Sequence, residues 1–106
     1  MPIDEITVDD LASLPTGSFV LDVRNPDEHA EARVPGVVLI PLPELESRVD
    51  ELPDTGQVYV ICRSGARSAR AAELLATRGI AATNVAGGTQ AWIESGRAVD
   101  SGPVTD

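Results

Sequence analysis

One stretch, V-Y-V-I-C-R-S-G-A-R-S-A-R from Val58 to Arg70, indicates both the fold and the chemistry of this chain. Its first four residues, 58–61, are apolar and too few for a helix, so they predict a buried strand. The strand runs into Cys62, the only cysteine of the chain. Residues 69–78 then predict a helix, with Gly79 at its C′ position. Cys62 is therefore expected at the carboxyl end of a strand, on a tight loop that leads into a helix.

The residues of this loop are small or cationic, which suits anion binding. Successive backbone N–H groups in such a loop can form a nest for an anion, and the dipole of the following helix adds positive potential. A thiol placed there ionises more readily than a free thiol, and its thiolate is the nucleophilic form. A lone cysteine is otherwise often a small core residue. The neighbouring arginines, Arg63 and Arg67, favour the reactive interpretation.

Composition limits the class of protein. The 106 residues are enough for one domain with its own core. A single cysteine excludes an intrachain disulfide framework and, with only one histidine, a Cys/His zinc cluster, so we expect no metal and no other cofactor. The sequence predicts neither a signal peptide nor a membrane span, and a free thiol suits reducing conditions, so we expect a cytoplasmic protein. A net charge of −9 argues against nucleic-acid binding.

Strands alternate with helices along the chain. This order predicts an α/β domain with a mostly parallel central sheet and helices on both faces. The strands are expected at residues 6–8 (an edge strand), 18–23, 37–40, 58–61 and 82–85. The helices are expected at residues 9–14, from 26, from 43, at 69–78 and at 89–95. We expect one domain over residues 1–99 and a frayed C-terminal tail at 100–106.

Two of these helices begin with clear capping signals. Thr7 can cap the first, while Asn25 as N-cap and Pro26 at the first helical position begin the second. Glu28 stands where a capping box places its carboxylate. In the last helix, Trp92 and Ile93 are expected on the buried side.

Three segments, in this order, resemble the single-domain rhodaneses, the thiosulfate-type sulfurtransferases. The first runs from L-D-V-R at Leu21 through V-P-G to I-P-L at Ile40, the second is C-R-S-G-A-R-S at Cys62, and the third is N-V-A-G-G-T-Q-A-W from Asn84. The resemblance implies a rhodanese-like domain in which Cys62 carries a persulfide. Sulfane sulfur would pass from an anionic donor such as thiosulfate to a thiol or cyanide-like acceptor.

The resemblance and the loop chemistry together predict the site. Cys62 would be the catalytic residue. Guanidinium groups suit the oxygens of a thiosulfate-like donor, and Ser64 and Ser68 would either donate to that anion or cap the helix. The predicted substrate-binding residues are Arg63, Ser64, Gly65, Ala66, Arg67 and Ser68.

Residues outside the loop are expected to support it. Asp22 and Arg24 would do so from the neighbouring strand, as an ion pair or loop cap rather than as reacting groups. For His29 the preferred interpretation is packing and not general-base chemistry. Two residues depart from the family pattern: Arg33 stands where histidine is usual, and Leu39 where a polar residue is usual. These departures bear on donor preference and on the rim of the site.

Two other functions fit part of the pattern. Related phosphatases and arsenate reductases have seven-residue loops of the form C-x5-R, whereas the loop from Cys62 to Arg67 has six residues, which suits a single sulfur atom. A non-enzymatic sulfur-carrier or partner-binding module would use the same cysteine chemistry. The expected partners are a small anionic sulfur donor and a thiol acceptor such as a thioredoxin-like or other sulfur-relay protein, with neither nucleic acid nor a membrane involved.

Overall fold

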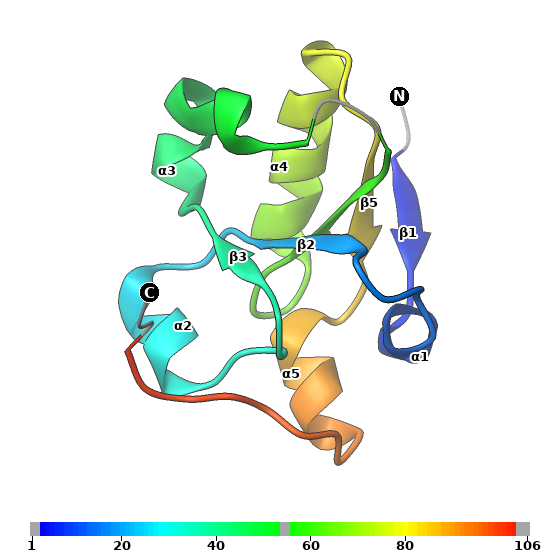
Figure 1. Cartoon of the computed structure of the whole chain (residues 1–106), viewed down its shortest axis with the longest axis vertical. Coiled ribbons are helices and arrows are strands. Elements are labelled where there is room, and N and C mark those ends of the chain that lie inside the picture. The colour runs from blue at the N-terminus through cyan, green and yellow to red at the C-terminus, as the bar shows by residue number, and fades with distance from the viewer. Residues whose placement is uncertain (1–2, 54–55, 104–106) are drawn as a thin grey trace.

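The protein folds around a five-stranded parallel sheet, as the alternation of elements predicts. The structure is a computed structural model that describes residues 3–53 and 56–103. The order of the strands is β1-β5-β4-β2-β3 (Figure 1), so β4 is central and carries Cys62 at its carboxyl end. The strands are β1 (Asp4–Ile6), β2 (Phe19–Asp22), β3 (Val38–Leu39), β4 (Val58–Ile61) and β5 (Ala82–Val85).

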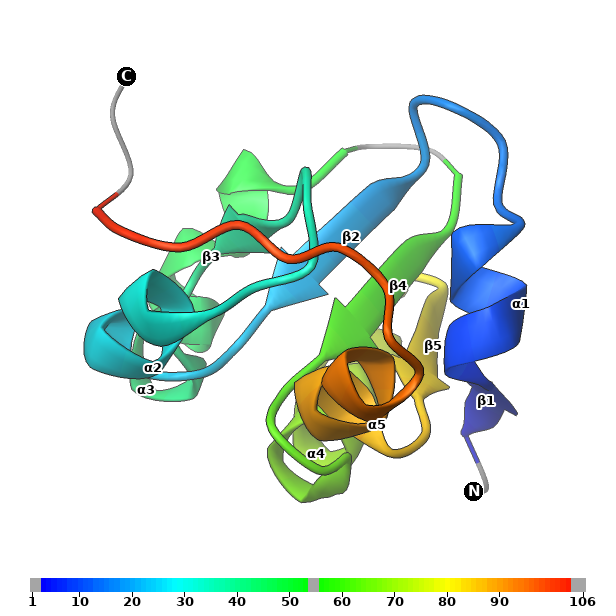
Figure 2. The same ribbon diagram turned by 90° about the horizontal axis from the view of Figure 1, so that it is seen from below.

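Helices cover both faces of the sheet (Figures 1 and 2), with α3 and α4 on one face and α1 and α5 on the other. Within the described ranges, no helix is long and apolar enough to span a bilayer. The helices are α1 (Val8–Ala12), α2 (Pro26–Glu31), α3 (Leu42–Leu45), the 3-10 helix η1 (Glu46–Glu51), α4 (Ala66–Thr77) and α5 (Gly88–Glu94).

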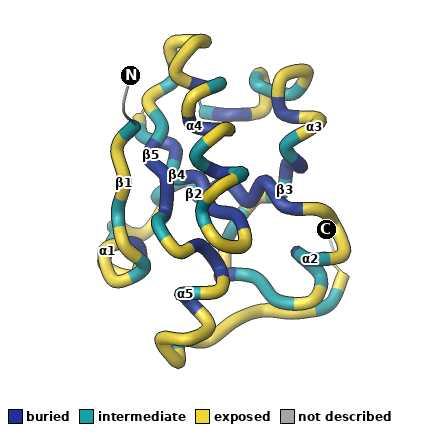
Figure 3. The backbone as a smooth tube through the Cα atoms, turned by 180° about the vertical axis from the view of Figure 1, so that it is seen from behind, coloured by how far each residue is buried: buried dark blue, intermediate teal, exposed yellow. Residues whose placement is uncertain are grey.

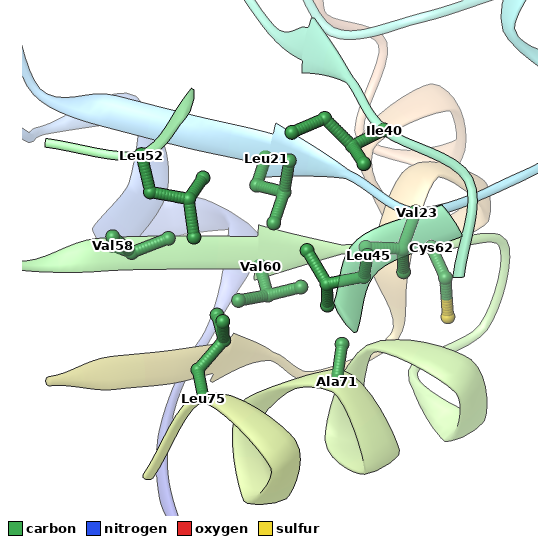
Figure 4. Packing of buried hydrophobic residues seen from close by; sticks show 10 residues of the cluster. All are labelled: Leu21, Val23, Ile40, Leu45, Leu52, Val58, Val60, Cys62, Ala71 and Leu75. Carbon is green, nitrogen blue, oxygen red and sulfur yellow. The ribbon is translucent and has the colours of Figure 1, made fainter. Parts of the chain in front are cut away.

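Strand alternation divides the core into two clusters. Successive side chains of a strand point to opposite faces, so Val58 and Val60 pack towards α4, together with Cys62 (Figure 4). Ile61 joins the smaller cluster beneath α1 and α5, which contains Trp92. Burial is concentrated in the central strands, while the edge strand β1 is mostly exposed (Figure 3). The same alternation places the cysteine on the α4 face of the sheet.

Several element bounds differ from the predicted ones for local reasons. The first strand ends at Ile6 because Thr7 already forms the capping box of α1, which begins at Val8. Helix α4 begins at Ala66, three residues earlier than predicted, because Gly65 takes a left-handed conformation and serves as its N-cap. Arg67 and Ser68 therefore lie in the first turn of α4 and not in a loop.

The strands at 58–61 and 82–85 and the start of α2 at Pro26 match the expected positions, and the remaining elements differ by a residue or two. The strand expected at 37–40 is reduced to Val38–Leu39, and the helix expected from 43 begins at Leu42 and tightens into η1. The prediction for the last helix was right for Trp92, which is buried, and wrong for Ile93, which is 47% exposed.

The segment expected to fray from residue 100 is held against the domain. The backbones of Asp100 and Arg33 exchange two hydrogen bonds of 2.9 Å, and Gly102 N donates to Ala30 O. The Arg33 guanidinium also donates to Gly102 O at 2.8 Å and to His29 O at 3.1 Å. This residue, which departs from the family pattern, ties the C-terminal segment to α2. Residues 104–106 lie outside the described part.

Candidate functional site

The Cys62 thiol lies inside the bend between β4 and α4 (Figure 4) and is almost fully buried, with 1% of the residue exposed. Its Sγ accepts a hydrogen bond from Gly65 N at 3.0 Å and one from Ser68 Oγ at 3.2 Å. These donors come from the N-cap and the first turn of a 12-residue helix, where the backbone N–H groups have no partner within the helix. The bend therefore surrounds the sulfur with donors, as the sequence predicts.

These donors favour the thiolate form of Cys62. Burial by itself raises the pKa of the thiol, because it disfavours the charged form. Hydrogen bonds from the Ser68 hydroxyl and from the backbone at Ser68, Gly65 and Ser64 outweigh burial, so the pKa lies below its usual value of 9.0. Ser68, for which donation to a bound anion or helix capping was predicted, places its hydroxyl 3.2 Å from Sγ, where it can donate to the sulfur.

Helix α5 holds the opposite side of the bend. Thr89 N and its hydroxyl donate to Cys62 O at 2.8 and 3.0 Å, and Gln90 N donates to Arg63 O at 3.0 Å. A side chain at Gly88 would place its Cβ 2.5 Å from Cys62 O, so only glycine allows this approach. Because the carbonyls are bonded to α5, the N–H groups of the bend face the sulfur.

The Arg67 guanidinium forms an ion pair with Glu28 of α2. Its Nη1 and Nη2 donate to Glu28 Oε1 and Oε2 at 2.7 and 2.8 Å. Glu28 also accepts from Asn25 N at 3.1 Å, as the predicted capping box requires. The hydrogen bonds from Arg67 are the main reason that the pKa of Glu28 falls from 4.5 to about 2, although partial burial opposes them. An incoming anion would compete with Glu28 for this arginine.

Asp22 and Arg24 form a buried ion pair that closes the end of β2, in agreement with their expected structural role. Arg24 donates from Nε and Nη2 to Asp22 at 2.8–3.1 Å, and its backbone N–H donates to Asp22 Oδ1 at 3.0 Å. His29 is 2% exposed, with Nδ1 2.9 Å from Asp22 Oδ2. The expected packing of His29 is confirmed, and its polar contact with Asp22 was not predicted.

A pocket of about 320 Å³ lies beside the bend, between α2 and α5. Arg63 is exposed and lines this pocket. Ser64 and Ala66, close to it in the chain, are also exposed. The exposed Ile93 side chain forms an apolar part of the pocket wall. The pocket is lined by Arg24, Glu28, Glu31, Ala32, Arg63, Thr89, Gln90, Ile93 and Glu94.

Two parts of the site were not predicted from the sequence. One is the Glu28–Arg67 pair, whose members are 39 residues apart. The other is Asn84, which is 1% exposed in β5 and accepts a hydrogen bond of 2.5 Å from Ser68 Oγ. A signal for Asn84 was present, because an amide within the buried strand A-T-N-V requires polar partners.

These features define an α/β domain with a buried cysteine, hydrogen-bonded through its sulfur, at the carboxyl end of its central strand. The family model of the rhodanese-like domain matches residues 7–95, which is most of the chain. The chain therefore belongs to the rhodanese-like domain family.

Individual relatives agree with this assignment. The chain is 43% identical over 74 residues to YrkF of Bacillus subtilis, whose name proposes a sulfur carrier protein, and the match covers 69% of this chain but 40% of YrkF. It is 35% identical over 79 residues to a sulfurtransferase of Allochromatium vinosum, which covers 74% of each protein. The crystal structure of a rhodanese-related protein from Thermoplasma volcanium superposes with a TM-score of 0.86 at 36% identity, covering 92% of this chain and 97% of that one.

Proposed function

We propose that this protein is a sulfurtransferase that carries sulfane sulfur as a persulfide on Cys62. The observation that carries the proposal is the set of hydrogen bonds from Gly65 and Ser68 to Sγ, which lowers the pKa of the only thiol in the chain. A thiol that is already ionised needs no general base to act as a nucleophile. The sulfurtransferase name of the Allochromatium vinosum relative supports the same reaction class.

The reaction has two displacement steps. In the first, the Cys62 thiolate attacks the outer sulfur of a donor such as thiosulfate; a new S–S bond forms, and the old one breaks as sulfite leaves with its electron pair. In the second, a thiolate or cyanide attacks the outer sulfur of the persulfide and Cys62 leaves as the thiolate. Such covalent catalysis gives ping-pong kinetics.

We assign supporting roles to the rest of the site. The N–H groups of the bend would stabilise both the thiolate and the persulfide. Arg63, at the exposed rim, would attract an anionic donor. Arg67 would bind the oxygens of that donor once its ion pair with Glu28 opens. Ser64 and Ala66 would contribute to the wall that meets the donor, while Asp22 and Arg24 would hold the rim in shape.

The decisive measurement is the intact mass of the protein after incubation with thiosulfate. We expect the addition of one sulfur atom, removed again by cyanide or dithiothreitol. The matched control is Cys62→Ser, which should keep the fold and gain no mass. If no sulfane donor changes the mass of the wild-type protein, the proposal fails.

A second candidate is a sulfur carrier that exchanges sulfur with one protein partner. Two observations favour it: the name of YrkF, and the Glu28–Arg67 pair that a small anion would have to open. The two functions differ in their donors. An enzyme of the first kind turns over thiosulfate and cyanide in steady state, whereas a carrier is loaded by a protein-bound persulfide and shows little such turnover.

A further inference from the structure

Sheet register brings a polar row from the edge strand to the site. In the parallel pairing, Glu5 of β1 lies opposite Asn84 of β5, and Asn84 lies opposite Val60 of β4. Cys62 follows two residues after Val60 and points to the same face. Ser68, on the buried side of α4, lies above this face and is 0% exposed. The topology therefore connects a carboxylate on an exposed strand with the nucleophile.

The hydrogen bonds of this row fix the orientation of the Asn84 amide. Its Nδ2 donates to Glu5 Oε2 at 2.8 Å and to Gly65 O at 3.3 Å. Both of these atoms are acceptors only, so the amide nitrogen must face them. Asn84 Oδ1 is thereby directed at Ser68 Oγ as an acceptor.

The Ser68 hydroxyl then has two acceptors for one proton. It lies 3.2 Å from Cys62 Sγ and 2.5 Å from Asn84 Oδ1, and a serine hydroxyl has a single hydrogen to donate. When Cys62 is a thiol, its S–H can donate to Ser68 Oγ, and Ser68 donates to Asn84. When Cys62 is a thiolate, a donor to the charged sulfur is worth more than a donor to a neutral amide, so the Ser68 hydrogen turns to Sγ.

We propose that Asn84 and Glu5 are positioning residues that compete with Cys62 for the Ser68 proton and so restrain the nucleophilicity of the thiol. The negative charge of Glu5 polarises the Asn84 amide and makes its oxygen a better acceptor, because hydrogen bonds in a chain polarise one another. The relevance of this restraint to sulfur transfer rests on the proposed function. The effect on the ionisation of the Cys62 thiol does not depend on that function. The inference about ionisation and the proposed function can therefore fail separately.

Other charged and titratable groups also surround the cysteine, and the test must leave them unchanged. They are Arg63 and Arg67 from the bend and α4, and Asp22, Arg24, Glu28 and His29 from the end of β2 and α2. The substitution Glu5→Gln leaves all of these groups unchanged, and the glutamine oxygen can still accept the hydrogen bond from Asn84. It therefore removes the charge from one end of the row.

The measurement is the rate of alkylation by iodoacetamide as a function of pH, which reports on Cys62 alone because the chain has no other cysteine. We expect Glu5→Gln to raise the rate below the midpoint about two- to threefold and to move the midpoint to lower pH. Ser68→Ala should lower the rate and move the midpoint to higher pH. The matched control is Asp4→Asn, which removes the same charge one residue away on the other side of β1.

The decisive comparison is Glu5→Gln in the Ser68→Ala background. If Glu5 acts through Ser68, the acceleration disappears there, whereas a long-range field effect would persist. The proposal is overturned if Glu5→Gln and Asp4→Asn have equal effects, or if Glu5→Gln accelerates alkylation as much without the Ser68 hydroxyl as with it. Glu5 is exposed on an edge strand, so the variant is expected to fold, which thermal unfolding checks.

Discussion

Two arginine–carboxylate pairs flank the cysteine bend, with the same chemistry and different surroundings. Arg24 and Asp22 are joined at 2.8 Å, with 5% and 1% of their side chains exposed. Arg67 and Glu28 are joined at 2.7 Å, with 34% and 23% exposed. The first pair is further bonded to His29 and to Ala32 O, whereas Glu28 of the second pair also accepts from Asn25 N. Each pair contributes one residue to the pocket, Arg24 and Glu28.

The difference in burial gives the pairs different roles. Separating two charges that are out of reach of water leaves each one unsolvated, so the Asp22 pair is fixed in place. At the Glu28 pair, which is partly exposed, water or another anion can replace either partner at a small cost. One pair therefore maintains the shape of the site, and the other can exchange its partner with a substrate.

The largest effect is expected from Asp22→Asn. The substitution keeps the shape of the side chain but leaves the buried Arg24 without a counter-charge, and breaking a buried pair in this way costs about 3–5 kcal/mol. Urea unfolding should show a loss of this size. The control is Glu51→Gln, which breaks an exposed pair with Arg48 and should leave the unfolding midpoint nearly unchanged. Equal stability of Asp22→Asn and wild type would show that the buried pair does not hold the end of β2.

A smaller effect, on activity, is expected from Glu28→Gln. Glutamine still serves in a capping box, but it no longer neutralises Arg67, whose donors become available to an anion. We expect kcat/KM with thiosulfate to rise about 3- to 10-fold, which corresponds to the free energy of a weak ion pair. Glu31→Gln, which removes the same charge from the same pocket, should change it by less than about twofold. A fall in kcat/KM would mean that Glu28 holds Arg67 in its productive position.

Local signals account for the part of the fold that the sequence predicted. The apolar run ending at Cys62 corresponds to β4, and Thr7 and Asn25 begin α1 and α2 where their capping patterns indicate. The start of α4 was placed too late because Gly65, taken as a loop residue, is itself the N-cap in a left-handed conformation. A three-residue error of this kind matters here, since it moves Arg67 and Ser68 onto the helix.

Contacts between distant segments explain what the sequence left out. Residue type and spacing identified Cys62 and the arginines, but the partner of Arg67 comes from α2 and the partners of Ser68 and Asn84 come from β5 and β1. These pairings depend on strand order and register, which periodicity does not encode. The burial of Asp22 and His29 follows from the same packing.

The smallest effect concerns the acid stability that the partly exposed Glu28–Arg67 pair provides. The pKa of Glu28 is about 2 in the folded protein and 4.5 when free of its partners. A carboxylate with a depressed pKa stabilises the fold above its unfolded pKa and loses that contribution as the pH falls through the folded one. The contribution of Glu28 should therefore be complete above about pH 5, small near pH 2 and absent below about pH 1.

The test compares the free energy of unfolding of the wild type with that of Glu28→Gln at several pH values from 7 down to 2. Because Arg67 is about a third exposed and solvent screens the pair, we expect a difference of about 1 kcal/mol at pH 7 that is almost lost at pH 2. The two proteins differ only at residue 28, so the difference between them isolates the contribution of Glu28. A difference that stays constant from pH 7 to pH 2 would mean that Glu28 stabilises the protein by packing or capping, and that the charge of its partner contributes nothing to the fold.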